Sequence, residues 1–388
     1  MNPKRIQQQL RTFQRMLDAY DGKQPLARFL TLFFKENKQM GANDRRTISH
    51  WAYSYYRLGN ALYDSLRIER LMVAVYLCNN GSDVVAYLDP TLYQTIQYSF
   101  DKKIALLRDK YKFNEEDIYP LLSECSVTID RSEFLKSLFR QPDLFIRIHR
   151  KERDTVSAVL DRNQITYHEV DSYCLALPNG TRLDKISDLF GKYQIQDLSS
   201  QRTAVYFNAK YGEKWWDACA ASGGKSLLLL DTCPTIELLV SDVRPSILRN
   251  LDERFEQANI RQYRRKIVDL TKGTANILGN EMFDGIILDA PCSGSGTWGR
   301  TPEMMKHFEM TRLEYFVSLQ RSIILNVIRH LKLNAPLIYI TCSVYRRENE
   351  DQVAFLEQQG LQLEQMEVLK GYENRADTMF VARLIKNK

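Results

Sequence analysis

Apolar residues recur at helical spacing through the first third of the chain. They repeat every three or four positions from Ile6 to Leu17, and the pattern returns over residues 26–33, 48–66 and 71–77. Strand-type alternation of apolar and polar residues is scarce in this part. We therefore predict an all-helical domain over residues 1–135.

The pattern changes over the next 65 residues. Residues 144–149 (LFIRIH) alternate as a strand does, residues 153–160 repeat as a helix does, and residues 165–170 and 173–177 are typical of short strands. These segments predict a small α+β subdomain over residues 136–200.

From residue 201 onward, strand patterns alternate with glycine turns and helix patterns. The predicted strands include WWDACA, IELLVSD, KIVDL, FDGIILDA and LIYITCS, and helix patterns lie between them. Such alternation indicates a doubly wound α/β domain with a mostly parallel sheet, Rossmann-like in architecture, over residues 201–388. In such domains the ligand crevice lies outside the carboxyl ends of the strands.

Composition excludes several classes of protein. The chain has 388 residues, 44% of them hydrophobic and 26% charged, and its mean hydropathy is −0.39. No apolar run approaches the ~18 residues that a membrane span needs, and the chain starts with polar residues. We therefore expect a cytoplasmic protein that neither spans nor binds a membrane. Separately, we expect the chain to be able to work as a monomer.

The cysteines and histidines are scattered. The seven cysteines form no C-x-x-C pair, and the five histidines are equally dispersed. This arrangement predicts neither a disulfide framework nor a metal site, so any cysteine chemistry would be thiol chemistry.

Positive charge is concentrated near the N-terminus. Residues 1–70 hold 13 Lys and Arg against 6 Asp and Glu, whereas the whole chain has a net charge of +6. Such segregation fits a surface that binds a polyanion, although a solvated basic helix face would give the same count. Basic and aromatic residues interleave here, a mixture suited to phosphate contact and base stacking: Arg45, Arg46, Trp51, Tyr53, Tyr55, Tyr56, Arg57, Arg67 and Arg70.

Polar, reactive or glycine residues follow five of the predicted strands. Asp242 comes 19 residues after Gly223, the spacing at which an acidic side chain in such folds accepts a ribose hydroxyl pair. Asp269 could accept from an adenine amino group or could cap the turn before Thr271. The other strand ends are Asp217–Gly224, Asp289–Cys292 and Thr341–Ser343.

Two nucleotide-binding motifs are nearly matched. CAASGGKS, residues 219–226, lacks only the first glycine of the phosphate-loop pattern, and IILD, residues 286–289, resembles the metal-holding strand of such proteins. GSGTWG, residues 294–299, satisfies G-x-G-x-x-G but does not directly follow its strand. A phosphate-loop NTPase acting on RNA therefore remains an alternative, as does a catalytically silent RNA-binding scaffold.

DAPCSGSG (residues 289–296), TCS (residues 341–343) and the loop CAASGGK together resemble the Fmu/Sun (RsmB/RsmF-like) family of RNA cytosine-C5 methyltransferases, which use S-adenosylmethionine. The resemblance extends from about residue 140 to the end. The N-terminal part is more loosely similar to the NusB-type RNA-binding domain of bacterial members. One departure is Ser222, where the family has proline.

The resemblance implies a site in which Cys342 adds to carbon 6 of cytosine, making carbon 5 nucleophilic enough to accept a methyl group. It further implies that Cys292 assists release of the product and that Asp289 holds the base at N3. Because a free thiol is mostly protonated at neutral pH, Cys342 needs a nearby positive group, and we expect Lys225 to supply it. We expect the S-adenosylmethionine site to comprise Cys219, Ala220, Ala221, Ser222, Gly223, Gly224, Lys225, Asp242, Arg244, Asp269 and Asp289.

The partner that the resemblance implies is RNA. Ribosomal RNA is the first expectation, with transfer RNA as the alternative. Since carbons 5 and 6 of cytosine are out of reach inside a duplex, the target base must be single-stranded or flipped out.

Overall fold

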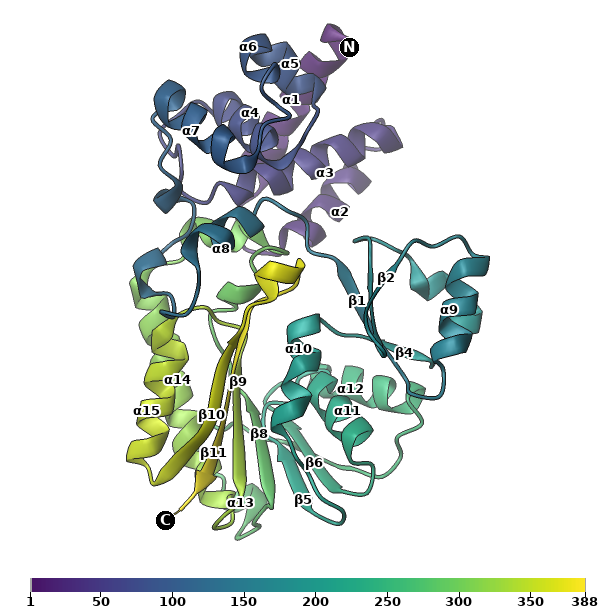
Figure 1. Cartoon of the computed structure of the whole chain (residues 1–388), viewed down its shortest axis with the longest axis vertical. Coiled ribbons are helices and arrows are strands. Elements are labelled where there is room, and N and C mark those ends of the chain that lie inside the picture. The colour runs from purple at the N-terminus through teal and green to yellow at the C-terminus, as the bar shows by residue number, and fades with distance from the viewer. Residues whose placement is uncertain (1, 388) are drawn as a thin grey trace. The chain divides into compact units, whose positions relative to one another are not determined.

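The computed structural model of the chain describes residues 2–387, which form two compact units (Figure 1). We call them the helical unit, residues 2–123, 130–141 and 298–309, and the sheet unit, residues 124–129, 142–297 and 310–387. The division at residues 135 and 200 that the sequence suggests remains a prediction.

The helical unit confirms the expectation of a helical N-terminal region. Its α-helices are α1 (Pro3–Ala19), α2 (Leu26–Glu36), α3 (Ala42–Arg57), α4 (Arg67–Cys78), α5 (Asp83–Leu88), α6 (Pro90–Tyr93), α7 (Phe100–Tyr111) and α8 (Arg131–Ser137). The helix pattern read through to residue 66 breaks at Arg57. The chain turns there, and the Asn60 N–H donates to the Asp117 carbonyl instead of continuing the helix.

A short segment distant in sequence completes the helical unit. Residues 298–309, which follow the DAPCSGSG motif almost directly, contain the 3-10 helix η7 (Pro302–His307). Trp298 packs against Tyr119 with ring centroids 5.2 Å apart. The buried Glu303 carboxylate accepts from the Leu26 N–H at 2.9 Å, so it caps α2, whose own N-cap position is a proline.

A four-stranded antiparallel sheet forms one part of the sheet unit. Its order is β2-β3-β1-β4, built from β1 (Leu144–Ile148), β2 (His168–Asp171), β3 (Cys174–Leu177) and β4 (Tyr193–Ile195). Helix α9 (Arg153–Arg162) packs on it through Val156 and Leu160. The sequence predicted β1, β3 and α9 well, placed β2 three residues too early, and gave no signal for the three-residue β4.

The second sheet of this unit has seven strands in the order β10-β11-β9-β8-β5-β6-β7. Strands β5 to β9 run parallel to one another, whereas β11 pairs antiparallel with both β9 and β10. The strands are β5 (Lys214–Asp217), β6 (Glu237–Asp242), β7 (Arg264–Ile267), β8 (Gly285–Asp289), β9 (Pro336–Thr341), β10 (Leu361–Leu369) and β11 (Met379–Lys386). This arrangement confirms the predicted doubly wound α/β fold with a mostly parallel sheet.

Helices cover both faces of this sheet. Figure 1 shows α14 and α15 on one face and α11 and α12 on the other. The α-helices of the sheet unit after α9 are α10 (Leu198–Arg202), α11 (Gly224–Thr232), α12 (Pro245–Gln257), α13 (Ala275–Leu278), α14 (Met310–Val327) and α15 (Glu350–Gln358). Leu227, Leu251 and Phe255 from α11 and α12 form one core with Val240 and Ile287 of the strands.

The antiparallel hairpin β10–β11 was not predicted as strands. Most side chains of β10 between its ends are exposed because β10 is an edge strand, so the alternation that reveals a half-buried strand is absent there. Across residues 2–387, none of the helices has both the length and the apolar character needed to cross a membrane. The same residues contain no group of three or more His, Cys, Asp or Glu side chains placed to hold a metal ion.

Candidate active site

The strand ends singled out in the sequence lie at one edge of the seven-stranded sheet. Asp217 of β5 pairs in register with Ile287 of β8, and Asp289 of β8 pairs with Ile340 of β9. Because β5, β6, β8 and β9 are parallel, their carboxyl ends point the same way. The residues that follow them form the candidate site.

The loop between β5 and α11 is held in a sharp turn. The Ala220 N–H donates to the Ser241 carbonyl at 2.8 Å, and Ala221 has a φ of +46°. Gly223 has a φ of +82°, and a Cβ there would lie 2.7 Å from the Phe255 ring. Gly223 is therefore required both for backbone conformation and for close packing on α12.

The serine that replaces the family's proline gains a contact of its own. The Arg254 guanidinium donates through Nη1 to the Ser222 hydroxyl at 2.9 Å and to the Ser222 carbonyl at 3.1 Å, and through Nη2 to Gln194 at 3.0 Å. A proline could not accept through its side chain. Ser222 therefore ties the loop to α12 and to the small sheet.

Asp242 lies at the end of β6 with its side chain only 5% exposed. Both of its oxygens accept from the Arg244 guanidinium, at 2.9 and 3.0 Å, and Oδ2 also accepts from the Ala221 N–H at 3.1 Å. Burial alone would raise the pKa of Asp242, but the hydrogen bonds and charge of Arg244 outweigh burial and lower it. Asp242 and Arg244 therefore sit together beside the loop.

Asp269 has a more local set of contacts. It lies two residues beyond β7, and its carboxylate accepts from the Thr271 N–H at 3.1 Å and the Thr271 hydroxyl at 2.6 Å. Lys272 lies 3.3 Å away. These hydrogen bonds lower the pKa of Asp269. The turn-capping contact that the sequence allowed is thus present, and a ligand contact for Asp269 stays a prediction.

The most deeply buried acid of the site is Asp217, the last residue of β5. Its side chain is fully buried and accepts from the Ser226 hydroxyl at 2.5 Å, while within residues 2–387 its Oδ1 has no hydrogen-bond partner. Burial raises the pKa of Asp217 to about 7. Burial, with Asp217, Asp242 and Asp289 nearby, also raises the pKa of the Cys219 thiol well above its ordinary value, so Cys219 stays protonated.

Lys225 and Asp289 form a pair across the crevice. The Lys225 ammonium lies 3.1 Å from Asp289 Oδ2 and donates to the Ser200 hydroxyl at 2.9 Å. Ser200 comes from the QDLSSQ segment, whose Gln196 side chain donates to Ser200 and to the Gly224 carbonyl. Sequence reasoning paired Lys225 with Cys342 instead and assigned no role to Ser200.

The two cysteines expected to carry the chemistry lie in contact. The Sγ atoms of Cys292 and Cys342 are 3.3 Å apart, although 50 residues separate them in the chain. The hydrogen bond with Cys342, followed by burial, raises the pKa of Cys292 well above its ordinary value. Cys292 therefore stays protonated in this environment.

The basic and aromatic residues of the helical unit divide into buried and exposed groups. Arg57 and Arg70 are buried and donate to the carbonyls of Leu138 and Gly59. Tyr55 and Tyr56 are buried as well. These four side chains therefore stabilise the helical packing.

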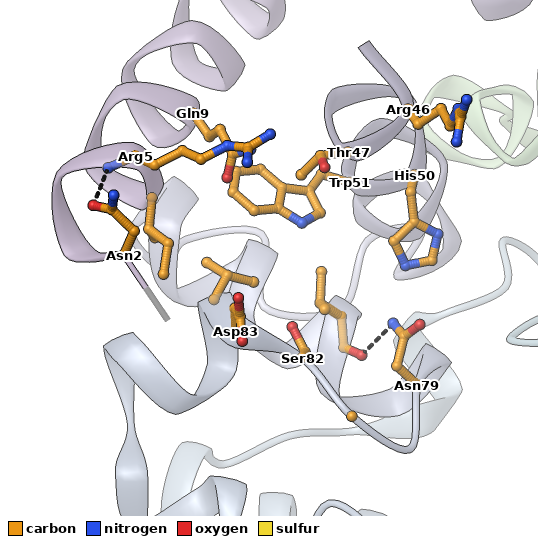
Figure 2. A pocket seen from close by; sticks show the side chains of 14 residues that line it. Asn2, Arg5, Gln9, Arg46, Thr47, His50, Trp51, Asn79, Ser82 and Asp83 are labelled. Carbon is orange, nitrogen blue, oxygen red and sulfur yellow. Dashed lines mark hydrogen bonds between the residues drawn. The ribbon is translucent and has the colours of Figure 1, made fainter. Parts of the chain in front are cut away.

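A polar cavity of about 750 Å³ remains in the helical unit, lined by α1, α3 and the residues before α5 (Figure 2). Arg46 and His50 are exposed at its border, and Figure 2 shows the Arg5 side chain extending over Trp51. The nearly buried Trp51 also lines the cavity. All the residues that line this cavity belong to the helical unit.

Comparison with known proteins identifies the second half of the chain. Residues 204–385 match the family model of the 16S rRNA methyltransferase RsmB/F. These residues form an RsmB/F-type methyltransferase domain. The resemblance carried by DAPCSGSG and TCS is thereby confirmed, and the match supports S-adenosylmethionine as the cofactor.

Relatives of the RsmB/F-type domain include two curated bacterial proteins named ribosomal RNA small subunit methyltransferase B. The protein of Xylella fastidiosa (strain 9a5c) is 36% identical over 167 residues, which cover 43% of this chain and 39% of that protein. The protein of Shewanella oneidensis is 30% identical over 234 residues, covering 58% and 53%. The chain thus matches about half the length of these relatives or less.

Two solved structures share the fold. PH0851 superposes with a TM-score of 0.72 at 19% identity, covering 100% of this chain and 99% of that one. NSun6 from Pyrococcus horikoshii, solved with SFG, has a TM-score of 0.60 at 18% identity, covering 67% and 94%. The fold of the RsmB/F-type domain is therefore the one these proteins have.

Proposed function

We propose that the chain is an S-adenosylmethionine-dependent RNA cytosine-C5 methyltransferase that acts on ribosomal RNA. The observation that carries the proposal is the contact of Cys292 and Cys342 at the ends of adjacent strands, beside the Lys225–Asp289 pair. The names of the bacterial relatives support ribosomal RNA of the small subunit as the substrate.

The residues of the crevice fit S-adenosylmethionine. The charges of Asp217, Asp242 and Asp289 all raise the pKa of Cys219, so these three carboxyl groups lie close together. Asp217 Oδ1 is a buried acceptor that has no hydrogen-bond partner within residues 2–387. Such a crevice favours a ligand with positive charge. When bound, S-adenosylmethionine supplies an electrophilic methyl group. The loop 219–224, Asp242 and Arg244 would hold it.

The two cysteines have different roles in this proposal. The Cys342 thiolate adds to carbon 6 of cytosine while N3 takes up a proton from water, and Asp289 holds the resulting N3–H, so carbon 5 becomes nucleophilic. After methyl transfer, water takes the proton from carbon 5, the bond from Cys342 Sγ to carbon 6 breaks to return the thiolate, and N3 gives its proton back to water, which restores the aromatic ring. Cys292, protonated and 3.3 Å away, is placed to assist this release.

The same geometry disfavours a phosphate-loop NTPase. In a phosphate loop the lysine reaches the phosphates and the following serine binds magnesium. Here the Lys225 ammonium pairs with Asp289 and the Ser226 hydroxyl donates to Asp217. The silent scaffold is disfavoured because the cysteine pair and the Lys225–Asp289 pair are both intact.

Transfer of labelled methyl groups tests the proposal. Free small-subunit ribosomal RNA, assembled small subunits and transfer RNA are incubated with labelled S-adenosylmethionine and digested to nucleosides. We expect label in 5-methylcytidine with the wild type and with Cys233→Ala, a control thiol outside the crevice, and none with Cys342→Ala. Full turnover by Cys342→Ala would refute the assignment of the nucleophile. No label on any RNA, with measurable cofactor binding, would favour the scaffold.

A further inference from the structure

A buried carboxylate lies behind the two cysteines. Glu348 ends the 3-10 helix η9 (Arg346–Glu348), and its side chain is 0% exposed. No step described so far uses it. A buried charge of this kind is costly unless its oxygens are fully hydrogen-bonded, so its partners indicate what it does.

Within residues 2–387, the Glu348 carboxylate accepts four hydrogen bonds and donates none. Oε1 accepts from the Ser293 N–H at 2.8 Å and from Gln320 Nε2 at 3.2 Å. Oε2 accepts from the hydroxyls of Ser293 and Ser343, each at 2.5 Å. An ionised carboxylate only accepts, so this set of donors suits the charged form although burial raises the pKa of Glu348.

The donors lie next to the reacting groups in the chain. Ser293 directly follows Cys292, and Ser343 directly follows Cys342, so one side chain joins the two loops that carry the thiols. The loops also meet through their backbones, because the Gly296 N–H donates to the Cys342 carbonyl at 2.9 Å. A Cβ on Gly296 would lie 1.9 Å from the Thr378 carbonyl oxygen, so only glycine permits this approach.

We propose that Glu348 is a positioning residue that fixes the separation and orientation of the Cys292 and Cys342 thiols by binding the residue after each. The inference rests on the proposed function, since it assigns both thiols to one reaction. We call the hydrogen bonds of Glu348 to Ser293 and Ser343 the clamp. Gln320 adds to the clamp, because its Nε2 also donates to the Pro291 carbonyl at 3.0 Å, on the other side of Cys292.

Glu348 also acts on Cys292 through its charge. The groups that raise the pKa of the Cys292 thiol are Cys342, by hydrogen bond and charge, and then Glu348. A negative charge behind the loop keeps Cys292 protonated beside Cys342. The clamp and the charge are separable, because one depends on the length of the side chain and the other on its ionisation.

Two variants of Glu348 separate these contributions. Glu348→Asp keeps the charge but shortens the side chain by one methylene, and Glu348→Gln keeps the length without the charge. Glu350→Gln is the matched control: Glu350 is half-buried, less than Glu348, and accepts from the Ser126 hydroxyl at 2.8 Å, but it binds neither cysteine loop. For each variant we would measure kcat, KM for RNA and for S-adenosylmethionine, and the pH profile of Cys292 alkylation.

For Glu348→Asp we expect kcat to fall about a hundredfold, the cost of misplacing a reacting group by about 1 Å, with both KM values unchanged. For Glu348→Gln we expect the alkylation profile of Cys292 to shift to lower pH, because a like charge has been removed. Glu350→Gln should change neither quantity. The proposal would be overturned if the kcat of both Glu348 variants stayed within twofold of the control. It would also be overturned if the loss of kcat were accompanied by weaker cofactor binding and a lower melting temperature, because the whole fold would then be damaged.

If the Glu348 variants do not fold, Ser293→Ala and Ser343→Ala decide the question. Each removes one hydroxyl and leaves the carboxylate with other donors. Each should lower kcat about tenfold, the value of one hydrogen bond to a charged group, and the double variant should lose less than the product of the two. Wild-type kcat in both would overturn the proposal. If the wild type methylates no RNA, the proposed function fails. The role of Glu348 is then tested independently by the pH profile of Cys292 alkylation, and it is overturned if Glu348→Gln has the same profile as the wild type.

Discussion

Asp217 makes the stability of the sheet unit depend on pH. Burial raises the pKa of this carboxyl from 3.8 to about 7, and the hydrogen bond from Ser226 only partly opposes this rise. Between these two values the folded protein holds a proton that the unfolded chain has released, so stability falls as pH rises. A difference of about three pKa units corresponds to about 4 kcal/mol, which is lost between about pH 4 and pH 8.

Asp217→Asn tests this magnitude. The amide oxygen still accepts from the Ser226 hydroxyl, and the side chain carries no charge, so this part of the pH dependence disappears. We expect the variant to exceed the wild type by a few kcal/mol at pH 8 and to match it near pH 4. Urea unfolding at several pH values, followed by the fluorescence of Trp215 and Trp216 on the same strand, measures the difference.

Asp242→Asn is the control of opposite sign. The pKa of Asp242 is lowered, so its contribution to stability is present above the ordinary carboxyl pKa and is lost as pH falls. Equal pH slopes for the wild type and Asp217→Asn between pH 5 and pH 8 would refute the reasoning, because Asp217 would then be ionised in the folded protein at neutral pH without cost.

Two further predictions concern the loop and the helical unit. Ser222→Ala removes the hydroxyl that accepts from Arg254, so we expect the free energy of unfolding to fall by about 1 to 2 kcal/mol, while methyl transfer is retained. Urea titration measures this loss, and an unchanged free energy of unfolding would show that the contact contributes nothing. Arg46 lies at the border of the cavity in Figure 2, so Arg46→Glu should weaken RNA binding and reduce the salt dependence of that binding. Arg28→Glu on α2, outside that cavity, should change neither quantity. Filter binding at two salt concentrations measures both, and equal RNA affinity of the two variants would argue against RNA contact at the cavity.

The convergence of the strand ends could be predicted from the sequence because it depends on local patterns. Buried strands followed by glycine or acidic residues give parallel strands whose ends share an edge, and Asp217, Asp242 and Asp289 lie there as expected. The contact of Cys292 with Cys342 follows from the order of β8 and β9.

The partners of these residues could not be predicted, because they come from distant parts of the chain. Arg254 of α12 donates to Ser222 in the loop before α11, and Ser200, which precedes β5, accepts from Lys225. Glu348 carries no strand-end or glycine signal; its position is defined only once η9 folds beneath both cysteine loops. Long-range hydrogen bonds have no period in the sequence.

The register between β8 and β9 determines the geometry of the cysteine pair. Asp289 lies opposite Ile340, so Cys292 and Cys342 stand three and two residues beyond a shared level of the sheet. A slip of one residue would move Cys342 by about 3.3 Å along the strand and turn the flanking side chains to the opposite face. It would also separate Ser293 from Ser343, which Glu348 holds together. The buried carboxylate therefore penalises any register other than the one that brings the two thiols into contact.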